Sequence, residues 1–105
     1  MATIRIVNPA TGDLEGEVPN HTVAQCLEAA QKANEAFVTW RTTLPRQRAE
    51  ILRRAFEIMI AEQEQLASLI VRENGKVLSD ARAEVAYAAE FFRWFSEEAV
   101  RIDGD

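Results

Sequence analysis

Cysteine, glycine and proline are all scarce in this chain of 105 residues, which has one, four and three of them. The single cysteine, Cys26, cannot form an internal disulfide bond, and the N-terminus lacks the basic and apolar regions of a signal peptide. We therefore expect a cytoplasmic protein. The four glycines never take the spacing of a dinucleotide-binding turn or a phosphate-binding loop. The sequence thus predicts no cofactor-binding residue.

Long hydrophobic runs and blocks of one charge are also missing. No apolar run approaches the roughly 20 residues that a membrane span needs. The 12 basic and 17 acidic residues give a net charge of −5, and the two signs are interspersed along the chain. This pattern argues against a nucleic-acid partner and against a membrane surface as partner. The length allows one domain at most, with a modest core.

The first 20 residues carry the pattern of a β-hairpin. Residues 4–7 are β-prone, residues 8–13 have turn chemistry, and residues 14–18 resume with alternating polarity. An isolated hairpin is marginal in water, so we expect this one to lie against another part of the protein.

Residues 22–105 carry helical patterns. Thr22 and Gln25 form a capping box, which predicts a first helix over residues 23–38. Pro45 suits the first turn of a second helix, and the stop signal comes at residues 74–75. A continuous helix between these signals would be about 45 Å long. Because the segment Ala61-Glu62-Gln63-Glu64 interrupts its apolar stripe, we expect a bend or a break there.

A third helix is predicted to start near Ser79 and Asp80. Two apolar stripes run along it, and one neighbouring pair of helices can cover only one of them. We expect the second stripe to be a candidate interface. The first, seam stripe consists of Ala81, Val85, Ala88, Phe92, Phe95, Ala99 and Ile102, and the candidate interface consists of Tyr87, Phe91 and Trp94.

These patterns together predict a mainly α fold. An N-terminal β-hairpin precedes three long helices, which we expect to pack roughly antiparallel with the middle one bent or broken. We expect Trp40, just after the first helix, to be a core anchor.

Residues that could carry chemistry are few. One cysteine and one histidine, His21, supply too few ligands for a zinc site. His21 precedes a helix and is expected to be solvated. Cys26 lies near a helix N-terminus, where a thiol becomes more reactive, but it also lies on the apolar stripe. We expect a buried, structural thiol there. The sequence predicts no catalytic and no metal-binding residue.

The order of several short motifs resembles the N-terminal segment of NAD(P)-dependent aldehyde dehydrogenases, most closely the succinate-semialdehyde dehydrogenase branch. The match extends over nearly the whole chain. Its motifs are VNPATG at 7–12, GEVP at 16–19, AF at 36–37 with Trp40, RAEIL at 48–52, LA at 66–67, ENGK at 73–76, AEV at 83–85, FRWF at 92–95 and Gly104.

The resemblance implies an oxidoreductase that converts an aldehyde to a carboxylic acid with NAD or NADP, through a cysteine nucleophile and a glutamate base. In that family these residues come later in the sequence, and none maps onto this chain. The resemblance therefore implies a single truncated domain over residues 1–105, from the outer part of an α/β coenzyme-binding domain. The chain alone is expected to be inactive.

Three interpretations remain open at this point. The chain could be an N-terminal fragment whose partner is the remainder of an aldehyde dehydrogenase. It could instead be a non-catalytic helical interaction module that binds itself or a full-length relative through Tyr87, Phe91 and Trp94. A decayed reading frame is the third interpretation. The coding sequence after Asp105 would distinguish them, because a glycine-rich segment followed by a catalytic cysteine would favour the first.

Overall fold

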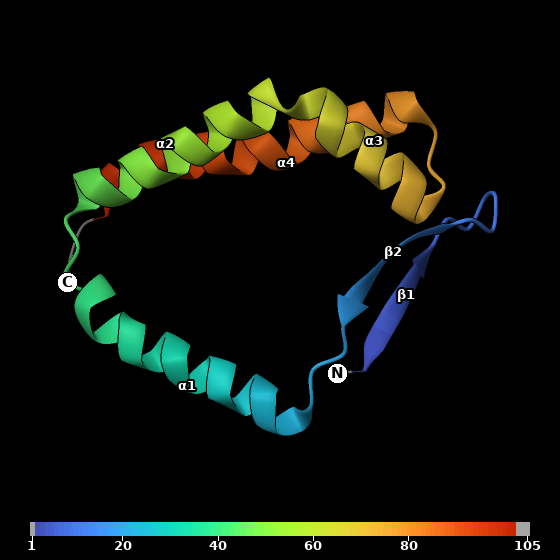
Figure 1. Cartoon of the computed structure of the whole chain (residues 1–105). Coiled ribbons are helices and arrows are strands. Elements are labelled where there is room, and N and C mark those ends of the chain that lie inside the picture. Colours follow the sequence, from blue (N-terminus) through green and yellow to red (C-terminus); the bar gives the residue numbers. More distant parts are fainter. Residues whose placement is uncertain (1, 103–105) are drawn as a thin grey trace.

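The chain begins in a two-stranded antiparallel sheet, as the sequence predicts (Figure 1). The computed structural model of the protein describes residues 2–102. Strand β1 (Thr3–Val7) pairs with β2 (Leu14–Pro19), with Thr3 opposite Pro19 and an irregularity between Ile6 and Val7.

Asn8 organises the turn between the two strands. Its side-chain Oδ1 accepts a hydrogen bond from the backbone N–H of Ala10 at 2.9 Å. Its own N–H donates to the carbonyl of Asp13, and its carbonyl accepts from the N–H of Gly12, both at 2.8 Å. Asn8 is only 8% exposed. A short polar residue that bonds to nearby backbone groups is well suited to such a turn.

Helices make up the rest of the chain. The middle predicted helix is broken as expected, and its interruption is Glu62, with φ −100° and ψ 16°. Thr22 and Gln25 form the predicted capping box. The helices are α1 (Val23–Trp40), α2 (Pro45–Ala61), α3 (Gln63–Asn74), α4 (Leu78–Glu98) and the short 3₁₀ helix η1 (Ala99–Arg101).

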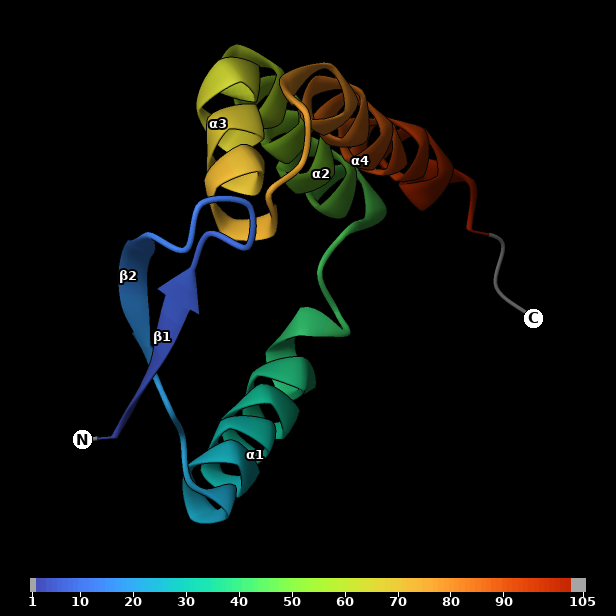
Figure 2. The same ribbon diagram turned by 90° about the vertical axis from the view of Figure 1, so that its right-hand side faces the viewer.

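Helices α2, α3 and α4 form one packed layer. Figures 1 and 2 show α2 and α4 side by side, and α3 also packs on α4. The core of this layer is a cluster of Ala67, Ala81 and Val85, and the two alanines have no exposed surface. Small side chains at these positions let the helix axes approach closely. Among the described residues no large side chain is fully buried, so the core is small.

The buried line of α4 differs from the predicted seam. Ala81, Val85 and Ala99 are buried as expected. The prediction that Phe92, Phe95 and Ile102 are core residues is wrong. Their exposed fractions are 37%, 53% and 67%, respectively. The buried line passes instead through Ala89 and Ser96, each next to a predicted position. Close helix packing favours small residues at the contact, and the aromatic rings turn outward.

Helix α1 is the exception to the predicted packing. It has no buried residue, and α1 appears in none of the substantially packed pairs of elements. The expectation that it packs against the other helices is therefore wrong. Cys26 is exposed, so the prediction of a buried thiol is wrong. Trp40 is 43% exposed, so the prediction that it anchors the core is wrong as well. No element of the described chain packs substantially on the predicted apolar stripe of α1.

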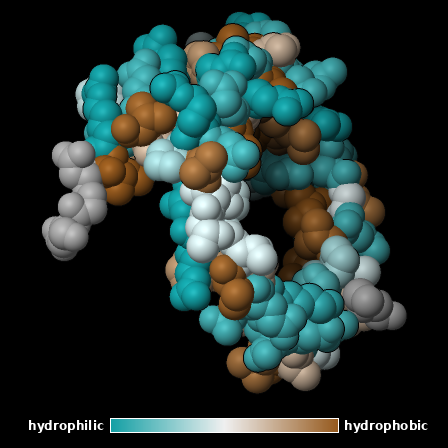
Figure 3. All heavy atoms as spheres, turned by 90° about the vertical axis from the view of Figure 1, so that its left-hand side faces the viewer, coloured by the Kyte–Doolittle hydropathy of each residue, from teal (hydrophilic) through white to brown (hydrophobic). Residues whose placement is uncertain are grey.

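The described chain is consequently open. Its radius of gyration is 17.9 Å and its extents are 52 × 38 × 20 Å. A compact domain of this length has a radius of gyration of about 13 Å. Figure 3 shows hydrophobic atoms exposed around a central opening. None of the helices in the described part of the chain is both long enough and apolar enough to span a membrane.

An ion pair helps to join α3 to α4, and a close backbone approach helps to join α3 to the hairpin. Arg82 of α4 donates to both carboxylate oxygens of Glu64 in α3, at 2.7 and 2.9 Å. These hydrogen bonds lower the pKa of the Glu64 carboxyl group. Gly75, which ends α3 with φ 66°, lies against the hairpin turn. A Cβ atom at Gly75 would lie 3.0 Å from the Cγ atom of Pro9. The hairpin thus lies on α3, as expected.

Candidate functional site: an open aromatic face

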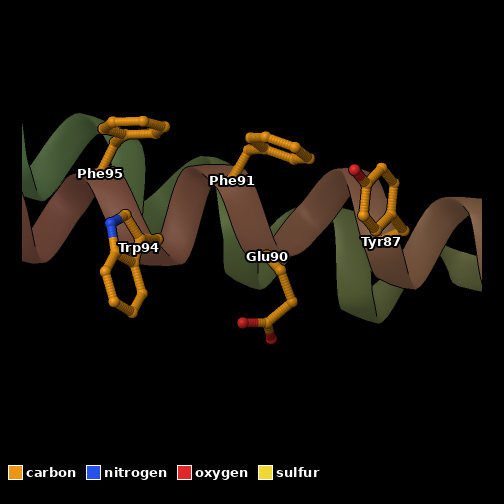
Figure 4. Close-up of a pocket in the computed structure, with 5 residues that line it drawn as sticks. All are labelled: Tyr87, Glu90, Phe91, Trp94 and Phe95. Atoms are coloured by element: carbon orange, nitrogen blue, oxygen red, sulfur yellow. The ribbon is translucent and has the colours of Figure 1, made fainter.

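The predicted interface residues lie together on α4. Tyr87, Phe91 and Trp94 are 68%, 48% and 61% exposed. With Glu90 and Phe95 they line a shallow apolar depression (Figure 4). The rings of Tyr87 and Phe91 meet edge to face, with centroids 5.1 Å apart. We call these five residues the aromatic face.

Helical periodicity and the packing of α4 explain why this face is open. Side chains at spacings of three and four residues lie on one side of a helix. Ala81, Val85 and Ala89 occupy the side that faces α2 and α3. Arg93 lies close to α2, with its guanidinium carbon 5.6 Å from the centre of the Phe56 ring. All five residues that line the depression of the aromatic face belong to α4. The role of this face as an interface stays a prediction.

A second apolar hollow was not predicted from the sequence. It lies where the end of α1, the start of α2 and the end of α4 come together. Arg48, Glu98 and Arg101 form its polar part, and Arg101 forms an ion pair with Glu98 at 2.9 Å. The hollow is lined mainly by Trp40, Arg48, Ile51, Leu52, Phe95 and Ile102. We call it the joint hollow.

No arrangement of catalytic or metal-binding groups is found among residues 2–102. Cys26 and His21 are both exposed, near the start of α1. The described side chains include no group of three histidine, cysteine, aspartate or glutamate residues that could hold a metal ion.

The residues that the structure describes do not fit a dinucleotide coenzyme. A coenzyme cradle needs glycines in a strand-to-helix turn, so that backbone N–H groups point at the phosphates. Gly12 lies in the hairpin turn, and Gly75 ends a helix against Pro9. Gly16 lies within β2. Residues 2–102 therefore show no cradle for NAD or NADP.

Comparison with known proteins then identifies the family. The protein-family model described as "Aldehyde dehydrogenase family" matches residues 1–105. The chain belongs to the aldehyde dehydrogenase family. This confirms the resemblance that the order of motifs indicated.

Among curated relatives, this aldehyde dehydrogenase chain is similar to glutarate-semialdehyde dehydrogenase of Pseudomonas putida. The two are 47% identical over 103 residues, which are 98% of this chain and 22% of the relative. It is also similar to succinate-semialdehyde dehydrogenase [NADP(+)] of Escherichia coli, with 43% identity over 97% of this chain and 21% of the relative. The chain spans about a fifth of the length of these relatives.

Solved structures confirm the fold. The chain superposes on an aldehyde dehydrogenase from Brucella melitensis with a TM-score of 0.95 and 42% identity, covering 99% of this chain and 22% of that one. Succinate-semialdehyde dehydrogenase from Burkholderia pseudomallei gives a TM-score of 0.94 at 42% identity, with the same coverage of 99% and 22%. The hairpin and the helices therefore have the form of the N-terminal region of this family.

The exposure of Cys26 leads to a prediction about its reactivity. We expect the thiol in the folded chain to react with a thiol reagent at nearly the rate measured for the same chain in denaturant, because α1 leaves it exposed. Stopped-flow labelling measures both rates. A Cys26→Ser, Ala67→Cys variant is the control, because Ala67 has no exposed surface and its replacement should react slowly. Slow labelling of Cys26 itself would contradict the prediction.

Proposed function

We propose that this chain acts as the N-terminal part of the coenzyme-binding domain of a cytoplasmic aldehyde dehydrogenase, with residues 1–105 belonging to a single domain. The full enzyme would oxidise an aldehyde to the carboxylic acid with NAD or NADP. The semialdehydes of short dicarboxylic acids, such as succinate and glutarate, are the proposed substrate class. Support comes from the two relatives above, which are named for these substrates.

The open arrangement of the chain is the observation that carries this proposal. Many large apolar side chains are exposed in α1 and α4, including Leu27, Phe37 and Trp94 at 67%, 56% and 61%. Exposed apolar surface of this kind is typical of a contact with another protein segment, among other binding surfaces. The chain spans about a fifth of its relatives' length, and in the proposed enzyme the other segments would cover these surfaces. The described residues would then build part of its framework.

In the proposed enzyme, residues 2–102 carry out no chemical step. The coenzyme accepts a hydride when it is bound, and this chain would support the domain that binds it. We expect the nucleophile, the base and the coenzyme contacts to lie in the other part of the enzyme.

Co-expression tests the proposal. The second piece is the Pseudomonas putida relative without the 103 residues that align with this chain. We expect neither piece alone to reduce NAD or NADP with glutarate semialdehyde, and the two together to do so, because the second piece would cover the open faces of the first. The absorbance of reduced coenzyme at steady state is the measurement.

Two variants of the chain make this experiment specific. Trp94→Glu places a charge on the aromatic face and should abolish the recovered activity, whereas Trp94→Phe keeps an apolar ring and should retain most of it. Activity of this chain alone would contradict its assigned supporting role. Failure of the two folded pieces to bind each other would contradict the proposal itself.

A helical interaction module that binds a second copy of itself is the second candidate function, favoured by the exposure of Tyr87, Phe91 and Trp94. It predicts concentration-dependent self-association in sedimentation velocity. The Phe91→Glu, Trp94→Glu double variant should shift the chain to monomer, because a charged side chain cannot be buried in the contact without a partner. Glu97→Gln, at an exposed position of α4 outside the aromatic face, is the control and should change little. A chain that stays monomeric at high concentration excludes this candidate.

A further inference from the structure

The joint between α1 and α2 consists of residues 41–44, and one side chain of α2 holds it. The Nη2 atom of Arg48 donates to the backbone carbonyls of Trp40 and Arg41, at 3.1 and 2.8 Å. Its Nε atom donates to the carbonyl of Thr43 at 3.0 Å. The guanidinium carbon also lies 5.5 Å from the centre of the Trp40 ring. Arg48 thus contacts the end of α1 through backbone and ring at once.

The chemistry of a helix end explains why an arginine suits this place. The last carbonyls of a helix have no partner within the helix, and they carry the negative end of its dipole. A guanidinium group offers several N–H donors in one plane, so it can satisfy carbonyls that lie in different directions. A lysine at this position could supply the charge but not the fixed geometry.

The surroundings of Arg48 direct it to these carbonyls. The side chain is half-buried in the joint hollow, between apolar groups such as Ile51 and Ile102. The carboxylate in the same hollow, Glu98, is already paired with Arg101. The bond to Thr43 is partly buried, and hydrogen bonds from a charged donor are stronger than those between neutral groups.

Other hydrogen bonds in the joint are local. The N–H of Thr43 donates to the carbonyl of Trp40 at 2.9 Å, and the hydroxyl of Thr42 donates to the carbonyl of Thr39 at 2.8 Å. These bonds shape the turn, but they do not reach into α2. At its other end, α1 continues into the hairpin, which touches α3 near its turn.

We propose that Arg48 sets the direction of α1 relative to the layer of α2, α3 and α4. Helix α1 lacks packed neighbours in the described chain, so its direction depends on how its ends are attached. With Arg48 in place, α1 keeps one orientation before anything covers its apolar stripe. A helix that is already oriented loses less conformational entropy when it docks. This consequence for docking rests on the proposed function, whereas the direction of α1 does not.

Distance measurements between spin labels test the proposal on the chain itself. Cys26, the one cysteine of the sequence, is exposed on α1, and Glu97→Cys adds an exposed site on α4. Pulsed electron paramagnetic resonance then gives the distribution of distances between the two labels. We expect one narrow peak for the parent chain. Arg48→Ala and Arg48→Lys should each broaden it at least about two-fold, because the joint gains backbone freedom.

The control is Arg54→Lys, on the same helix, where the side chain is exposed. It should leave the distribution unchanged. Circular dichroism should show the same helical content in every variant. A narrow peak in Arg48→Ala would overturn the proposal, because the hairpin end would then direct α1. A broad peak in the parent chain would overturn it as well. Loss of helical content in both Arg48 variants would also do so, since Arg48 would then hold the layer together.

Discussion

Ala81→Leu is expected to destabilise the chain by about 3 kcal/mol, the upper part of the range for overpacked cores. Ala81 has no exposed surface, and it lies in one cluster with Ala67 of α3. Three additional carbon atoms cannot enter without moving the two helices apart. Because single small domains have a free energy of unfolding of only about 5–15 kcal/mol and this core is smaller than usual, much of the stability would be lost.

Urea denaturation followed by circular dichroism measures this loss. The matched control is Ala83→Leu, two positions further along α4, where the side chain is exposed. Alanine and leucine both favour helices, so helix propensity contributes little to either change. We expect Ala83→Leu to alter the free energy of unfolding by less than about 0.5 kcal/mol. Equal effects of the two substitutions would show that Ala81 is not at a close helix contact.

Gly75→Ala is expected to cost about 2 kcal/mol and to detach the hairpin from α3. Its φ of 66° is a left-handed conformation, which strains any residue with a Cβ atom. The added Cβ would also lie 3.0 Å from Pro9 and 3.2 Å from Ala10. Amide hydrogen exchange should therefore accelerate first in β1 and β2, and urea denaturation gives the total change.

Two other glycines separate the causes. Gly12 has φ 82°, and a Cβ atom added there would have no neighbouring atom within 4 Å, so Gly12→Ala should show the backbone strain alone, about 1 kcal/mol. Gly16 has neither a positive φ nor a close neighbour, and Gly16→Ala should change the free energy of unfolding by less than about 0.5 kcal/mol. If Gly12→Ala and Gly75→Ala cost the same, the contact with Pro9 has no energetic role.

Local signals in the sequence predicted the elements well, because the groups that define them are close along the chain. The capping box of Thr22 and Gln25 starts α1, and the polar run around Glu62 breaks the middle helix. The glycine at 75 ends α3 in a left-handed conformation. Each of these effects depends on neighbours within about one helical turn, so one stretch of sequence contains the information.

Burial was harder to predict because it depends on which surfaces meet. The stripe of α1 that contains Cys26 shows that the helix has an apolar side, but not whether its cover lies in this chain. Along α4, the spacing of apolar residues allowed a buried line through either Phe92 or Ala89. Close approach of α2 and α3 favours the small side chain, and that approach is a property of the packed layer.

Of the two candidate sites, the aromatic face could be predicted from the sequence and the contacts of Arg48 could not. Tyr87, Phe91 and Trp94 were found from one helix, because their common side follows from their spacing. The contacts of Arg48 with Trp40 and Arg41 depend on the angle at which two helices meet. A pattern of residues within one helix carries no information about that angle.

The contact between Pro9 and Gly75 also has a consequence for the order in which the chain assembles. It closes a loop of about 66 residues, for which the length-dependent part of the closure entropy amounts to about 4 kcal/mol. Helices α3 and α4 are adjacent in sequence, so their contacts close much shorter loops and cost less closure entropy. Pairing of α3 with α4 then shortens the loop that the contacts between α2 and α4 must close. The layer should therefore assemble first and the hairpin should join it afterwards. On unfolding, the hairpin would detach first, while the three-helix layer stays intact.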